Sequence, residues 1–174
     1  RQKKMREIRG YRFAADGLLS SGSVKFAKDG STPETLNLSN LALGDRTNVG
    51  GTVTRTVDGR FEVELTGTEL DLTPYLKEDG TAVKLRAHGK VNKLWIGEDA
   101  AVANVEADIH HDGSSWRRIS MNGNVVKGKR ISVNYGDDGK SGHLEVRAAD
   151  AGNILKKLGL LSNLRGGVMT LSAA

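Results

Sequence analysis

Apolar and polar residues alternate along much of this chain, and such alternation predicts β-strands with one dry face and one wet face. Because several alternating segments follow one another, we expect an antiparallel meander. The clearest segments carry Val83, Leu85, Ala87 and Val91, then Ala101, Ala103, Val105, Ala107 and Ile109, then Ile131, Val133 and Tyr135, and then Leu144, Val146 and Ala148.

Asp-Gly pairs separate many of these segments. Both residues tolerate the positive φ that a tight hairpin turn requires, so the pair is a strong hairpin signal. The sequence therefore predicts turns at Asp16-Gly17, Asp29-Gly30, Asp58-Gly59, Asp79-Gly80, Asp112-Gly113 and Asp138-Gly139.

The predicted strands are long, and the sheet is expected to bend. Thr81 to Gly97 would span roughly 55 Å if fully extended. Glycines inside the pattern, at Gly22, Gly89 and Gly123, permit bulges and curvature. A slip at Asn40 predicts a bulge that keeps four leucines on the dry face, namely Leu36, Leu38, Leu41 and Leu43.

Helix is predicted in two short places. Asp150 is suited to cap a helix that carries Ile154, Leu155 and Leu158 on one stripe and ends at Gly159. Thr73-Pro74 could open a single turn. The fold class is therefore mainly β, a long curved antiparallel meander forming an open, groove-like sheet with one or two short helices. We expect two loose repeats, 1–80 and 81–174, each ending in a helical element, with a further strand begun after Gly166-Gly167.

Composition narrows the possible functions. The chain has 174 residues, 37% of them apolar, and 26 Lys plus Arg against 21 Asp plus Glu. The weak basic excess gives little support for nucleic-acid binding. Cysteine is absent, which excludes disulfides and thiol chemistry, and the apolar runs are far shorter than the roughly 20 residues that cross a bilayer. The opening Arg1-Gln2-Lys3-Lys4 suggests a piece of a longer protein.

Candidate chemical groups are sparse, and the interpretation is that the chain is not an enzyme and has no cofactor or metal. His110 and His111 are adjacent and would point to opposite faces of a strand. His88 and His143 stand alone in strand patterns. Trp95 and Trp116 could stack on a sugar or base, but packing within the sheet is the simpler interpretation. The common hydrolase, metalloprotease and nucleotide-binding motifs are missing.

Two stretches resemble a known family. Asp150-Ala151-Gly152-Asn153-Ile154-Leu155-Lys156-Lys157-Leu158-Gly159-Leu160, with Asn163 to Leu171 after it, resembles the carboxyl-terminal region of the AsmA-like superfamily, close to its YhdP branch and more distantly to TamB. Leu36 to Leu76 resembles the preceding repeat of that family. The amino-terminal membrane helix of such proteins is not in this chain, and neither is the segment that usually follows the Arg-Gly-Gly strand.

The resemblance implies a parent protein that is anchored in the inner membrane and extends through the periplasm, carrying phospholipids in an apolar trough and maintaining the outer-membrane barrier. The implied partners are phospholipid acyl chains and neighbouring repeats, with membrane contact through other parts of the parent and no nucleic acid. The candidate groove lining is Leu36, Leu38, Leu41, Leu43, Val83, Leu85, Val91, Val105, Ile109, Ile131, Val133, Leu144 and Val146, with Ile154, Leu155 and Leu158 on the covering helix.

Two alternatives stay open at this point. A structural or protein-binding β module of the cell envelope would use the same fold with a filled interior. A hydrolase or sugar-binding domain would need His110, His111 and Trp116 to converge in one pocket.

Overall fold

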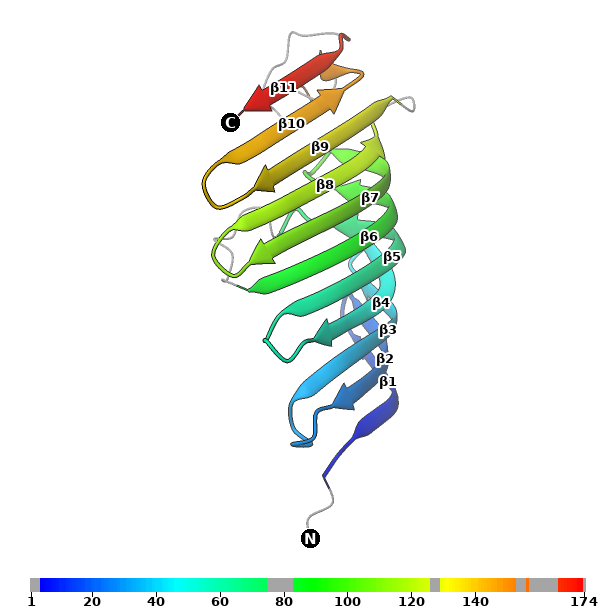
Figure 1. The fold of residues 1–174 in the computed structure, drawn as a ribbon. Helices are drawn as coiled ribbons and strands as arrows, with labels where there is room; N and C mark the ends of the chain where they lie inside the picture. The colour runs from blue at the N-terminus through cyan, green and yellow to red at the C-terminus, as the bar shows by residue number, and fades with distance from the viewer. Residues whose placement is uncertain (1–3, 75–82, 126–128, 153–155, 157–165, 174) are drawn as a thin grey trace.

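The computed structural model describes residues 4–74, 83–125, 129–152, 156 and 166–173, and its strands stack into one long curved sheet (Figure 1). The strands are β1 (Glu7–Ala15), β2 (Leu18–Phe26), β3 (Pro33–Leu43), β4 (Thr47–Arg55), β5 (Phe61–Asp71), β6 (Lys84–Trp95), β7 (Ala101–Asp112), β8 (Trp116–Asn124), β9 (Arg130–Asp137), β10 (Gly142–Ala148) and β11 (Met169–Ala173).

The strand order in the sheet is the order in the sequence, from β1 to β11. This confirms the predicted mainly β, open, curved sheet. All neighbouring strands pair antiparallel except β5 and β6, which are parallel. The expected boundary at residue 80 lies outside the described residues, between these two strands. Since β5 and β6 pair from Phe61 opposite Leu85 to Asp71 opposite Trp95, a single sheet runs through the boundary.

The Asp-Gly turns are confirmed wherever the structure describes them. Asp16-Gly17 forms the two-residue link between β1 and β2. Three more pairs lie in the links after β2, β4 and β9, and Asp112-Gly113 starts the turn after β7. Asp79-Gly80 lies outside the described residues.

The two long edges of the sheet, where strands turn back, differ in their turns. We call rim A the edge that holds the turns at Asp29, Asp58, Asp112 and Asp138, which lies on the left in Figure 1. Rim B is the opposite edge, with the turns at 16–17, 44–46 and 96–100.

The strands bend where their registers shift. The predicted bulge in β3 is confirmed, because the pairing with β4 skips from Leu38 to Leu41, and all four leucines share one face. Gly22 of β2 lies where the registers with β1 and β3 both shift, and an added Cβ there would stand 1.9 Å from the Asn37 carbonyl oxygen. Bulges bend strands and increase their twist, and these breaks account for the curvature in Figure 1. Gly89, by contrast, lies in an unbroken ladder.

The alternation predicted for β7 is wrong at its start. Asn104 adopts a positive φ of 50° and the register with β8 shifts between Ala103 and Glu106. Val102 therefore joins Val105 on the dry face, while Ala101 and Ala103 lie opposite Trp95 and Lys93 on the other face.

The predicted helices fall largely outside the described residues. Ala151, Gly152 and Lys156 are helical, in agreement with a helix that starts after Asp150, but Ile154, Leu155 and Leu158 are not described. Thr73-Pro74 forms a turn. The predicted last strand is confirmed as β11, which pairs antiparallel with β10 after Gly166 and Gly167.

Candidate functional site

An unbroken apolar strip runs along one face of the sheet, which we call the apolar face. Residues directly opposite one another on neighbouring strands form one row across all eleven strands: Ile8, Val24, Leu36, Val53, Val63, Ala87, Ile109, Ile119, Tyr135, Leu144 and Ala173. With strands about 4.8 Å apart, ten steps make a strip of roughly 48 Å.

A second row lies beside the first, one step closer to rim B. It also crosses every strand and contains no charged residue: Tyr11, Gly22, Leu38, Gly51, Leu65, Gly89, Ala107, Met121, Val133, Val146 and Leu171. Apart from Tyr11 and Met121, the row consists of aliphatic residues and three glycines, Gly22, Gly51 and Gly89, so side chains are small or absent at several strands along this line.

The apolar face is deepest beyond the second row, in a zone toward rim B that we call the bend. Val49, Val91 and Val105 are nearly fully buried there, and Val102 is 1% exposed. Toward rim A the same face opens, since Leu85 and Ile109 are half-buried and Trp116 is 43% exposed. Accessible apolar surface therefore lies between the bend and rim A.

The predicted lining residues lie on this face, except Val83. Leu36, Ile109 and Leu144 belong to the first row and Leu38, Val133 and Val146 to the second, while Leu85 lies at the rim A end and Leu43 at the rim B end. Near the bend the pairs are Leu41 with Val49, Val91 with Val105, and Ile131 with Ala148. Val83 precedes β6, and its carbonyl oxygen lies 2.8 Å from His111 Nδ1.

Sequence reasoning missed several residues of the apolar face. Val63 and Leu65 follow the same alternation as Phe61, so that pattern could have revealed them. Val49 and Val102 lie next to register breaks, where a period of two no longer predicts the face, and Leu94 lies opposite Val102. No local signal in the sequence marks those breaks clearly.

The opposite face, which we call the polar face, carries hydrogen-bonded ladders. Asn37 donates from Nδ2 to Ser23 and accepts from the Thr52 hydroxyl, both at 3.2 Å. His88 Nδ1 lies 2.8 Å from Asp108, and Lys90 pairs with Glu106 at 2.9 Å. Such cross-strand pairs stabilise a sheet face that is wetted by solvent.

The turns at rim A hold ionised aspartates. The Asp112 carboxylate accepts hydrogen bonds from the backbone N–H groups of Ser115 and Ser114, which hold its pKa well below the usual range. Asp138 does the same with Ser141 and Lys140. The Asp29 pKa is lowered first by the Thr32 hydroxyl and that of Asp58 by the Thr56 hydroxyl.

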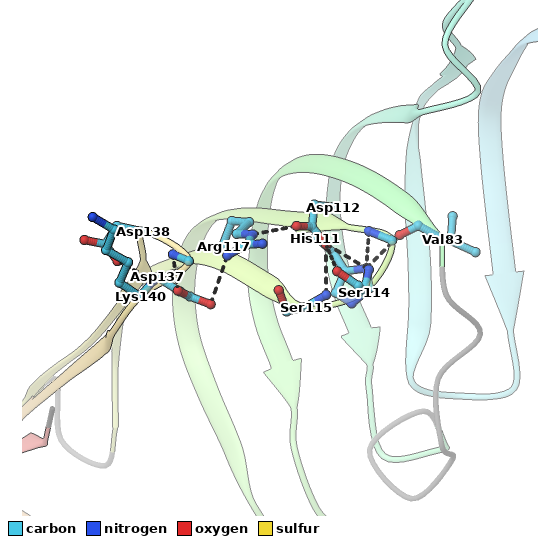
Figure 2. Close-up of polar contacts among 11 residues, drawn as sticks. Val83, His111, Asp112, Ser114, Ser115, Arg117, Asp137, Asp138 and Lys140 are labelled. Carbon is cyan, nitrogen blue, oxygen red and sulfur yellow. Dashed lines mark hydrogen bonds and ion pairs between the residues drawn. The ribbon is translucent and has the colours of Figure 1, made fainter.

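Arg117 joins two of these turns. Its Nε donates to Asp112 at 2.5 Å and its Nη1 to Asp137 at 3.2 Å, as Figure 2 shows. The β7–β8 turn is thereby fastened to the end of β9.

The groups that a hydrolase would need do not converge. His110 lies opposite Arg86 and Arg118 on the polar face, and its pKa is lowered by burial and then by Arg86. His111 lies opposite Leu85, with its ring 4.8 Å from that of Trp116. Within the described part of the chain, no group of three His, Asp or Glu side chains could hold a metal ion.

No protein-family model, no curated protein and no solved structure matches this chain. None of the helices in the described ranges has the length and apolar character needed to cross a bilayer.

Proposed function

We propose that this chain is a segment of a lipid-transfer protein and that phospholipid acyl chains lie on its apolar face. The observation that carries the proposal is the pair of uncharged rows that cross all eleven strands without a break. A sheet that merely needed one dry side for stability would be covered by a second layer. Here the surface between the bend and rim A is partly open.

The energetics favour this occupant. Exposing an acyl chain to water costs about 0.8 kcal/mol per CH₂, or roughly 13 kcal/mol for a chain of about 16 carbons. The strip offers mostly aliphatic contact along its length, and no charged side chain interrupts either row. A chain can therefore slide along it without meeting a single tight site.

We also propose that further strands of a longer protein continue the sheet at both of its ends. In the described sheet, β1 and β11 each have one strand neighbour, so each offers a free backbone edge to a further strand. Apolar side chains stay exposed near both ends, with Phe13 on β1 and Leu171 on β11 each about half exposed. These features support neighbouring repeats of an AsmA-like parent protein, anchored in the inner membrane and extending through the periplasm.

Native mass spectrometry of the purified chain tests the proposal. We expect co-purified phospholipid, and we expect Leu65→Asp to lose it, because this change places a charge in the second row. Thr66→Asp adds the same charge one residue later on the polar face and is the matched control. Circular dichroism of both variants checks that the sheet is retained.

The proposal fails if the wild-type chain, mixed with phospholipid vesicles, carries no lipid in the mass spectrum. It also fails if folded Leu65→Asp carries as much lipid as the control. In either case a structural or protein-binding module of the envelope becomes the better account.

A further inference from the structure

The two ends of the apolar face differ in their side chains. At rim A the strands end in aromatic residues, with Phe26 on β2, Phe61 on β5, Trp116 on β8 and Tyr135 near the end of β9. At rim B the same face ends in aliphatic residues, namely Leu18, Leu43, Leu94 and Val102. Tryptophan and tyrosine have an apolar body with a polar tip, and they favour boundaries between hydrocarbon and water.

Trp116 and Trp95 illustrate the difference. The bulge between β7 and β8 places Trp116 opposite His111, on the side of Leu85, with 43% of the residue exposed. Trp95 lies on the polar face near rim B, where Arg46 and Lys93 approach its ring and its Nε1 donates to Glu69.

One arginine on the apolar face and the depth of the face at β6 also distinguish rim A from rim B. Arg55, at the end of β4, shares the apolar face with Phe61, and among the described residues it makes no ion pair. From Leu85 at rim A to Val91 at the bend there are six residue-to-residue steps, or roughly 20 Å of strand. One leaflet of a bilayer holds its acyl chains in about 15 Å, half the roughly 30 Å hydrocarbon core, so this arm of the sheet can accommodate one.

We propose that the bound phospholipid has a fixed orientation, with its headgroup at rim A and its acyl chains directed along the strands toward the bend. This inference rests on the function proposed above and adds an orientation to it. At β6 and β7 the rim B end of this face is closed, because Val102 and Leu94 are buried there, whereas Leu43 on β3 is 45% exposed. The aromatic side chains of rim A lie at the level of the glycerol and ester groups.

The two tryptophans allow a direct test by fluorescence quenching. Trp95→Phe leaves Trp116 as the reporter, and Trp116→Phe leaves Trp95 as the matched control. Each variant is mixed with vesicles of phosphatidylcholine that carries bromine either near the ester end or near the methyl end of its acyl chains. Native mass spectrometry of the same samples measures how much lipid is bound.

We expect Trp116 to be quenched at least twofold more by bromine near the ester end, and Trp95 to be quenched by neither lipid. Stronger quenching of Trp116 by bromine near the methyl end, or equal quenching by both, overturns the orientation and leaves the proposed function standing. Bound lipid without quenching of Trp116 also overturns it. Absence of bound lipid in every sample overturns the proposed function and the orientation together.

Discussion

Gly123 of β8 lies directly beneath Val102 of β7, so close that a Cβ atom added to Gly123 would stand 2.5 Å from Val102 Cγ1. Val102 is the largest fully buried side chain in the described core. The side chains of β7 thus cover the backbone of β8 at the bend, and a residue without a side chain is what permits the strands to curve there.

Gly123→Ala should therefore destabilise the sheet. The added methyl group forces Val102 and Val105 to move, and overpacking of this kind costs about 1–3 kcal/mol. Urea unfolding measures the loss. Gly136→Ala is the control, because a Cβ there meets nothing within 4 Å, and it should leave the stability unchanged or raise it by up to about 1 kcal/mol. Equal effects of the two substitutions would contradict this account of the bend.

Asp112 should make stability depend on pH. Its folded-state pKa is lowered by the turn N–H groups, so its contribution is present above the unfolded pKa of about 3.9 and is lost as the pH falls through the folded value. We expect Asp112→Asn to be less stable than the wild type near neutral pH, and the difference to shrink below about pH 4.

Urea unfolding at a series of pH values checks this. The control is Asp16→Asn, since the Asp16 carboxylate accepts no hydrogen bond from the described residues. A difference for Asp112→Asn that stays constant or grows toward acid pH would show that the turn does not stabilise the ionised carboxylate.

Arg46 should hold together two turns of rim B, the turn at 44–46 and the turn at 96–100. Its guanidinium lies 4.2 Å from the centre of the Trp95 ring and donates to the Glu98 carbonyl oxygen at 2.9 Å. Arg46→Gln should cost about 1 kcal/mol of unfolding free energy, typical of a cation–π contact at a partly exposed site. It should also shift the emission of Trp95 in a Trp116→Phe background. Arg55→Gln, which removes an unpaired arginine, should do neither.

Much of the fold could be predicted because its signals are local. Asp138-Gly139 predicts a turn from two adjacent residues alone. Leu36 and Leu38 predict the apolar face of their strand by simple alternation. The interruption of the alternation at Asn40 also predicts a structural feature. One bulge there allows four leucines to share a face of the sheet, as the register of β3 with β4 confirms.

The parallel pairing of β5 with β6 could not be predicted in this way. It joins Phe61 to Leu85 across a connection whose path depends on the whole sheet, and no residue type marks it. The alternation of β7 also changes phase at Asn104, so that different residues face the apolar side before and after it. This could not be predicted either, because the positive φ of Asn104 is a property of the folded strand. The candidate site was therefore predicted along the open arm of the apolar face and only in part at the bend, where Val49, Leu94 and Val102 were missed.

The most direct test of the central claim is a photo-crosslinking scan along β9. Benzoylphenylalanine replaces Ser132, Val133, Asn134 and Tyr135 one at a time, and phospholipid attached to the chain is measured after illumination. Val133 and Tyr135 belong to the two apolar rows, while Ser132 and Asn134 lie between them on the polar face. The account predicts lipid adducts at Val133 and Tyr135 and few at Ser132 and Asn134, whereas equal labelling at all four positions, or none, would contradict it.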